Sequence, residues 1–240
     1  MNNLKKFIII FLLLLQSCSS TPQKVESIIE EKDLDQQMIA AYNEGLNALK
    51  KGDVYYAGKK FNEAELLYPQ SEWAAKAVLM ASYGYYTQAY YNSAADELNR
   101  FIIKYPKNPN LDYAYYLLAM CHYESIVDEK KDLKPLLYAK DSFNLVIEKF
   151  PLTDFAIDAK YKIGLINDLL AAKEMYIARH YIKKEKWIAA VNRLKVIVED
   201  YDTTIYIEEA LHRLVEIHYK LGLVSEAKKY ANTLGYNYLS

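Results

Sequence analysis

The chain has 240 residues, of which 52% are hydrophobic and 25% are charged, with 24 tyrosines but only seven glycines and six prolines. Many large apolar side chains and few turn-forming residues favour packed helices and argue against a β-rich fold. The formal net charge is −1, so the surface offers no general field for a polyanion and nucleic acid is not expected as a partner.

The N-terminus has the organisation of a signal peptide. Residues 1–6 are short and cationic, and residues 7–15 form an apolar run of nine residues, far below the roughly 20 that a membrane-spanning helix needs. The next residues, Leu15-Gln16-Ser17-Cys18, resemble the bacterial lipobox. We therefore predict a lipoprotein signal peptide over residues 1–17. The alternative is an ordinary secretory signal with a chance cysteine.

By the lipobox resemblance, Cys18 becomes the first residue of the mature protein and carries diacylglycerol and N-acyl groups. Each buried methylene of such chains contributes about 0.8 kcal/mol, so several chains anchor a protein stably. Ser19 stands where lipoproteins retained in the inner membrane carry aspartate, which implies the outer membrane. Residues 18–34 are polar and charged, and we expect a lipidated tether there. Cys121 would then have no disulfide partner.

From about Asp35 the chain repeats itself. An aromatic residue, usually followed by proline and a polar helix cap, recurs at Tyr68, Tyr105, Phe150 and Tyr201, with spacings of 37, 45 and 51 residues. Proline ends one helix, and Ser, Thr, Asn or Asp caps the next. Such a period marks a solenoid of stacked helix pairs.

The first unit, residues 38–69, fits the tetratricopeptide pattern, in which small residues lie where two helices touch. The matching residues are Gly45, Ala57, Phe61, Ala64 and Pro69. Residues 75–106 fit less fully, with Ser82 where glycine is usual, and the third unit carries a charged insertion at 128–135.

The fourth unit predicts two helices over 155–184 and 187–201, and the fifth covers 204–239. The sequence thus predicts an all-α fold, an α-solenoid of about five tetratricopeptide-like helix pairs. We expect an N-terminal half with repeats one to three at 35–151 and a C-terminal half with repeats four and five at 152–240.

Motifs for catalysis or metal binding are missing from the sequence. There is no Gly-rich phosphate loop, Cys-x-x-Cys, His-Glu-x-x-His or Gly-x-Ser-x-Gly. Of the four histidines, His212 and His218 lie six residues apart, which puts them on different faces of a helix. We predict no enzyme, no metal and no cofactor besides the acyl groups. The run Lys183-Lys184-Glu185-Lys186 is either a solvated turn or a surface for an acidic partner.

In tetratricopeptide arrays the first helix of each pair lines the concave face. Placing the repeats in register predicts an apolar groove with phenolic tips, lined by Tyr42, Leu46, Leu49, Leu79, Tyr83, Tyr86, Tyr116, Met120 and Tyr123. Large rigid rings suit an extended or helical peptide with aromatic side chains. The alternative for each residue is packing against a neighbouring helix.

Two stretches, together with the lipobox and the insertion, closely resemble the BamD family, also called ComL. They are residues 105–113 (YPKNPNLDY) and residues 178–193, which end in Trp187-Ile188-Ala189-Ala190-Val191-Asn192-Arg193. The resemblance implies a lipid-anchored protein on the periplasmic face of the outer membrane, within the β-barrel assembly machinery. It implies that the C-terminal half binds the periplasmic domains of a BamA-like barrel subunit and that the N-terminal half receives unfolded outer-membrane proteins. Accessory lipoproteins are possible further partners.

By the same resemblance, Trp187, Asn192 and Arg193 face the barrel subunit. The alternative is that Trp187 packs between repeats and Arg193 is an exposed helix residue. The chain departs from the family at Tyr201-Asp202, which replaces aromatic-proline. Two other classes stay open: another tetratricopeptide envelope lipoprotein, such as a coordinator of cell-wall synthesis, and a repeat domain with a hydrolase site between helices.

Overall fold

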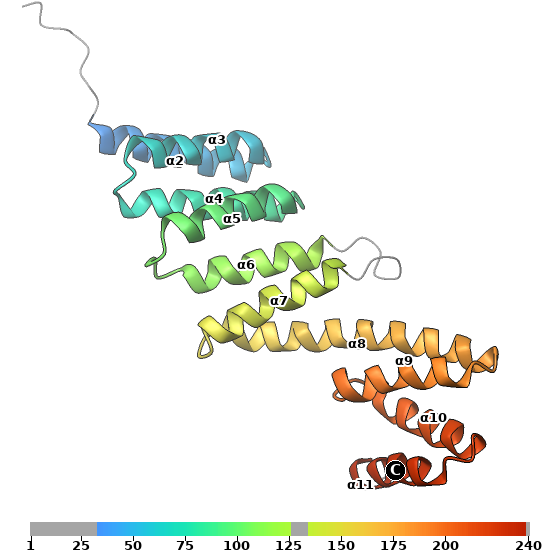
Figure 1. Ribbon diagram of the computed structural model, residues 1–240. Coiled ribbons are helices and arrows are strands. Elements are labelled where there is room, and N and C mark those ends of the chain that lie inside the picture. The colour runs from blue at the N-terminus through green and yellow to red at the C-terminus, as the bar shows by residue number, and fades with distance from the viewer. Residues whose placement is uncertain (1–32, 126–133, 239–240) are drawn as a thin grey trace, which may run out of the picture. The chain divides into compact units, whose positions relative to one another are not determined.

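The computed structural model describes residues 33–125 and 134–238, and within these ranges it contains ten α-helices and no β-strand (Figure 1). The helices are α2 (Leu34–Lys50), α3 (Val54–Leu67), α4 (Glu72–Thr87), α5 (Tyr91–Lys104), α6 (Leu111–Glu124), α7 (Lys134–Lys149), α8 (Asp154–Lys183), α9 (Trp187–Asp200), α10 (Ile207–Lys220) and α11 (Val224–Asn237). All of them belong to one unit that begins at Leu34.

Each helix packs against the next one in the chain, so that five helix pairs follow one another from α2/α3 to α10/α11 (Figure 1). The predicted all-α solenoid of five pairs is confirmed. The bounds of α8 and α9 agree within one residue with the two helices predicted for the fourth repeat.

Two of the capping residues that the sequence offers accept a hydrogen bond from the first turn of the next helix, whereas α6 and α10 have no side-chain cap bond. Ser71 Oγ accepts the Ala74 N–H at 3.2 Å, and Thr153 Oγ1 accepts the Ala156 N–H at 3.3 Å. These bonds satisfy donors that the first turn of a helix leaves without a partner. Asn110 precedes α6 but makes no side-chain cap bond, so this predicted cap is not formed.

Small residues let the helices of the first pair approach closely. A Cβ atom added at Gly45 would lie 2.9 Å from Phe61 Cδ1, and Phe61 is fully buried between Ala57 and Ala64. These are the positions that the tetratricopeptide pattern predicts. Ser82, at a position where glycine is usual, is buried and donates its hydroxyl to the Val78 carbonyl at 2.8 Å, which satisfies the polar group.

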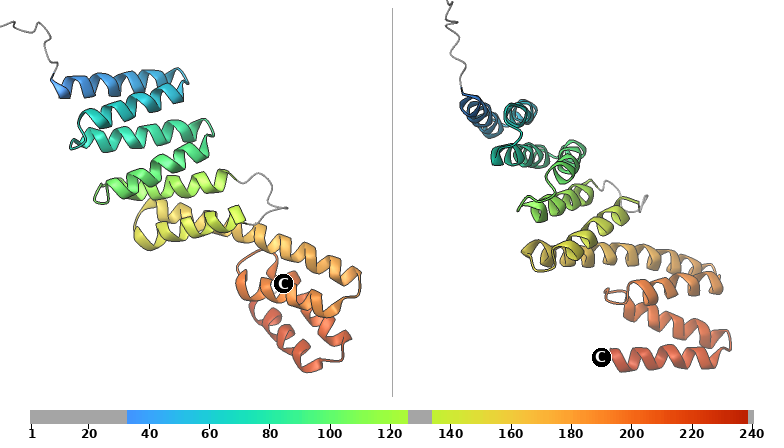
Figure 2. Two further views of the ribbon diagram at one scale, coloured as in Figure 1. Left: turned by 45° about the horizontal axis from the view of Figure 1, so that its top comes forward. Right: turned by 60° about the vertical axis from the view of Figure 1, so that its left-hand side comes forward.

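The 30-residue helix α8 contributes to two hydrophobic cores. Its residues up to Leu170, including Ile166, belong to a core with α6 and α7, and its residues from Ala171 on, including Met175, belong to a core with α9 and α10. Figure 2 shows α8 extending from the third helix pair to the fourth. The two cores therefore meet inside α8, whereas the sequence suggested a division at the turn before it.

Several expectations fall on residues outside the described ranges. These are the signal peptide at 1–17, Cys18, nearly all of the tether and most of the insertion. Lys134 and Pro135, which the sequence assigned to the insertion, instead begin α7. In the parts of the chain that the structure describes, no helix combines the length and the apolar character that a membrane span requires.

Candidate binding surfaces

The residues predicted to line a groove do not share one environment. Tyr42 is 4% exposed and Leu79 is 8% exposed, and the ring of Tyr42 lies 5.4 Å from that of Phe61 and 5.1 Å from that of Trp73. For Tyr42 and Leu79, and likewise for the buried Met120, the predicted groove position is wrong. Their side chains fill the contacts between helices instead, which was the alternative for each of them.

Leu46 and Leu49 are half-buried against the first core. They pack beside Ala48 and Phe61 and expose only part of their surface. They therefore stabilise the first helix pair more than they contribute to an open face.

An exposed group of phenols lies on α4 and α6. Tyr83 is 43% exposed, and Tyr86 is half-buried. Burial, with smaller contributions from the neighbouring hydroxyls of Tyr83 and Tyr86, raises the pKa of Tyr113 to about 12. The hydroxyls of Tyr83 and Tyr86 are therefore near enough to Tyr113 to act on its charge, although Tyr113 belongs to the next repeat.

Tyr116 and Tyr123 extend this group toward α8. Tyr116 donates its hydroxyl to Asp158 Oδ2 at 2.6 Å, and burial together with this bond raises the pKa of Tyr116. The Lys162 ammonium lies 5.2 Å from the ring centroid of Tyr123. The N-terminal half of α8 thus holds the two tyrosines in place.

The group continues onto α8 itself, beyond the three repeats in which the sequence predicted it. Tyr161 is 64% exposed and is near enough to Tyr123 to contribute to its raised pKa, which burial dominates. We use the name tyrosine cluster for Tyr83, Tyr86, Tyr113, Tyr116, Tyr123 and Tyr161. Sequence reasoning missed Tyr113, but its spacing of three residues from Tyr116 puts both on one helix face and could have indicated it.

The three residues expected to face a barrel subunit have contacts that lead to different helices. Trp187 is half-buried against the core that α8 forms with α9 and α10. The Lys220 ammonium of α10 lies 4.1 Å from its ring centroid. Arg193 Nη1 lies 3.2 Å from Glu174 Oε2 of α8, and its side chain is 43% exposed. Asn192 is exposed. The structure thus brings Trp187 to α10 and Arg193 to α8, on different sides of α9.

A serine and a histidine meet between α6 and α7, so the hydrolase alternative can be examined there. His122 Nδ1 lies 2.8 Å from Ser142 Oγ, and Ser142 donates its proton to the Tyr138 carbonyl at 2.8 Å. With that proton engaged, Nδ1 is the donor in the contact with Ser142. An activated nucleophile needs the opposite direction, in which the histidine accepts the serine proton.

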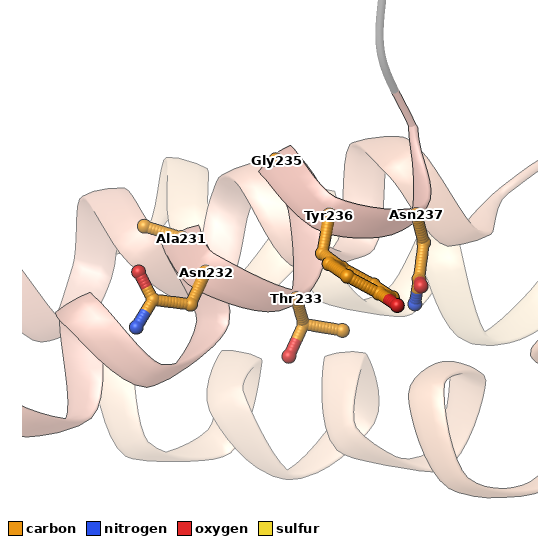
Figure 3. A pocket seen from close by; sticks show the side chains of 6 residues that line it. All are labelled: Ala231, Asn232, Thr233, Gly235, Tyr236 and Asn237. Carbon is orange, nitrogen blue, oxygen red and sulfur yellow. The ribbon is translucent and has the colours of Figure 1, made fainter.

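Among residues 33–125 and 134–238, no three His, Cys, Asp or Glu side chains gather where they could hold a metal ion. A hollow on α11 (Figure 3) is lined by Ala231, Asn232, Thr233, Gly235, Tyr236 and Asn237. All six come from one helix and none is charged, so the hollow has no charged group to hold an ion.

Residues 34–234 match the family model described as "YfiO: Outer membrane lipoprotein". The chain belongs to this family. The YfiO match covers every helix pair, which agrees with the five repeats of the structure.

Curated relatives of this YfiO family member carry the name "Outer membrane protein assembly factor BamD". One from Rickettsia prowazekii is 43% identical over 87% of this chain and 83% of its own length. One from Caulobacter vibrioides is 38% identical over 92% and 71%, and one from Neisseria gonorrhoeae is 31% identical over 75% and 70%. The resemblance to BamD that residues 105–113 and 178–193 suggested is confirmed.

Among solved structures, the chain is similar to the MamA protein, with a TM-score of 0.42 and 17% identity over 83% of this chain and 91% of that one. This likeness is too low to add to the assignment of the YfiO family.

Proposed function

We propose that this chain is a lipid-anchored scaffold of outer-membrane β-barrel assembly, which binds the periplasmic domains of a BamA-like barrel subunit and unfolded outer-membrane proteins. The observation that carries the proposal is the 43% identity, over 87% of the chain, to a relative named as an outer-membrane protein assembly factor. That name describes assembly and no reaction, and the role proposed here is binding without catalysis.

The anchor in this proposal is Cys18, carrying diacylglycerol and N-acyl groups and placing the chain on the periplasmic face of the outer membrane. The lipobox and the family's description as outer membrane lipoproteins support it. Accessory lipoproteins of the same assembly are candidate further partners.

Unfolded substrates would bind on the tyrosine cluster. Tyr83 and Tyr161 offer exposed rings, while Tyr116 is fixed by its bond to Asp158. Rings that are already held in place give contact area at a low cost in side-chain entropy. A strand of a membrane β-barrel alternates apolar and polar residues and is bordered by aromatic ones, which suits this surface.

The barrel subunit would bind on α9 through Asn192 and Arg193. Arg193 is half exposed and is oriented by Glu174, so part of its planar group remains open to a partner carboxylate. Trp187 contributes differently, because it packs against the core and against Lys220. We assign it to the partner-binding region through its exposed edge only.

Affinity purification of the full-length, lipidated chain from detergent-solubilised envelopes tests this function. We expect a barrel protein with periplasmic domains to co-purify. The change Arg193→Glu should lower its recovery about tenfold, because it places a carboxylate where the partner is expected to present one. Lys228→Glu on α11, which reverses a charge elsewhere, is the matched control. Recovery of cell-wall synthases in place of the barrel protein would contradict the proposal.

A further inference from the structure

The turn between α8 and α9 and the end of α10 carry four lysines: Lys183, Lys184, Lys186 and Lys220. The first three belong to the run 183–186, which is either a solvated turn or a surface for an acidic partner. All four lysines are exposed. Within residues 33–125 and 134–238, no carboxylate lies within ion-pair distance of any of the four ammonium groups. Glu185 lies in the same turn, so the four lysines and this glutamate together carry a charge of +3, against a net charge of −1 for the whole chain.

A notch of about 260 Å³ lies beside these lysines. It is lined by Ile182, Trp187, Arg213, Glu216, Ile217 and Lys220. We call it the Trp187 notch. The indole and the two isoleucines give it apolar walls, which fit a single aliphatic or aromatic side chain.

The two cations of the Trp187 notch differ in how they are paired. Arg213 is held by carboxylates of its own helix, with Nη1 3.0 Å from Glu216 Oε2 and Nε 3.5 Å from Glu209 Oε1. Lys220 lies over the face of Trp187 at 4.1 Å, a cation–π contact that leaves its charge without an anion. Lys220 therefore carries a charge in the notch that no carboxylate of the described residues neutralises, whereas Arg213 already has two carboxylates beside it.

We propose that the Trp187 notch binds an acidic segment of a partner protein, which inserts an apolar side chain against Trp187 and places a carboxylate on Lys220. The unpaired lysines of the α8–α9 turn complement further acidic residues on either side of that apolar one. Charge complementarity of this kind selects the partner and speeds its encounter. The inference rests on the proposed function, since it describes the chemistry of a partner of the C-terminal half.

The Trp187 notch is distinct from the surface around Arg193. The notch lies where Ile182 at the end of α8, Trp187 and Lys220 meet, whereas Arg193 pairs with Glu174, farther back along α8. The notch can be examined alone because its occupancy has its own spectroscopic signal.

Trp187 provides that signal, because the chain contains only two tryptophans. In a Trp73→Phe background of the full-length protein in detergent, Trp187 is the sole tryptophan. The probe is a blocked synthetic peptide with the core Glu-Glu-Leu-Glu-Glu. One control peptide replaces each glutamate by lysine, and a second replaces the leucine by serine.

We expect saturable change of Trp187 fluorescence with the acidic peptide only, and weaker binding at high salt because screening shortens the range of the charges. Lys220→Gln should raise Kd about fivefold, Lys220→Arg should restore it, and Lys228→Gln on α11 should leave it unchanged. Thermal unfolding of each variant checks that the fold is retained. Equal binding of the lysine peptide, or an unchanged Kd in Lys220→Gln, would overturn the proposal.

The outcome separates this inference from the proposed function. Recovery of a barrel protein by the wild-type chain, with no peptide binding in the notch, overturns the notch alone. Peptide binding with the expected Lys220 dependence, but no barrel protein recovered, supports the notch and contradicts the assembly role.

Discussion

The tyrosine cluster, in which Tyr83 and Tyr161 are exposed, and the α8–α9 turn offer different chemistry to a partner. The first is made of rings with phenol tips, held by contacts such as that between Tyr116 and Asp158. The second is made of lysines without carboxylate partners beside the Trp187 notch. Beneath both, the second helix of each of the first four pairs buries large apolar residues with no exposed surface, among them Phe61, Leu98, Phe143 and Leu194. One repeated core therefore supports two unrelated surfaces, which is how repeat proteins gain specificity.

The largest effect is expected where a core residue is removed. Phe61→Ala should lower the free energy of unfolding by about 3–5 kcal/mol, because it leaves a cavity in a close-packed interior. Tyr83→Ala, which removes an exposed ring of the tyrosine cluster, should stay within about 0.5 kcal/mol. Urea unfolding followed by circular dichroism compares the two variants. A similar decrease in the free energy of unfolding in both would mean that Tyr83 belongs to the core.

A second effect concerns a buried acid that joins the first two repeats. Glu65 is 2% exposed, and its carboxylate accepts hydrogen bonds from Lys104 at 2.8 Å, from Tyr105 at 2.7 Å and from Arg100. Burial acts to raise the pKa of Glu65, but these bonds outweigh burial and the pKa is lowered from its ordinary value of 4.5. Its charged form therefore stabilises the fold.

Glu65→Gln should lower the free energy of unfolding by about 1–3 kcal/mol at pH 7, a range reduced by the solvent exposure of Arg100 and Lys104. Because the pKa is lowered on folding, the contribution is complete above pH 4.5 and is lost as the pH falls through the folded-state pKa. Unfolding curves of both proteins at several pH values should converge in acid. A difference that does not depend on pH would show that the carboxylate charge is not the cause.

A third effect separates binding from stability in the tyrosine cluster. Tyr83→Ala should weaken binding of an aromatic-rich peptide in extended conformation about fivefold, since a rigid ring is removed from the contact. Fluorescence anisotropy with a labelled peptide measures this. Tyr219→Ala on α10, which removes a ring that is 70% exposed, is the matched control and should bind as the wild type does. An equal loss of peptide affinity in Tyr83→Ala and Tyr219→Ala would show that the tyrosine cluster is not a specific binding surface.

The smallest expected effect on stability concerns residues with a positive φ in the turns between paired helices. The turns within the first and fifth helix pairs have Gly52 and Gly222 at φ of 80° and 75°, but the corresponding turns of the second and fourth pairs have Ala89 and Glu185 at 60° and 56°. A side chain is strained in this left-handed region. Ala89→Gly and Glu185→Gly should each raise the free energy of unfolding by up to about 1 kcal/mol. Thermal unfolding checks this, and a decrease at either site would show that the turn is not strained.

Much of the fold could be predicted because its signals are local. Proline and a capping Ser71 or Thr153 mark where one repeat ends and the next begins, and Gly45 beside Phe61 marks the contact within a pair. The exposed side chains were harder to predict, because the first helix of each pair packs against the second helix of that pair and also against the next repeat. Periodicity places Tyr42 and Tyr83 on comparable faces, but only Tyr42 is covered by Trp73, which comes from the first helix of the next repeat.

The long helix α8 shows a second limit. Its sequence predicts its length, but not that Leu170 and Ala171 belong to different cores. That division depends on where α9 turns back along α8, which is set by contacts far apart in the chain. The same contacts decide that Trp187 lies under Lys220 while Arg193 pairs with Glu174.

Site-specific photo-crosslinking in intact cells tests the central claim most directly, with a crosslinking residue placed at Tyr83 in one strain and at Arg193 in another. We predict that position 83 captures unfolded outer-membrane proteins and that position 193 captures the barrel subunit. Capture of the same protein from both positions, or of cell-wall synthases from either, would contradict the division of one scaffold into two binding surfaces.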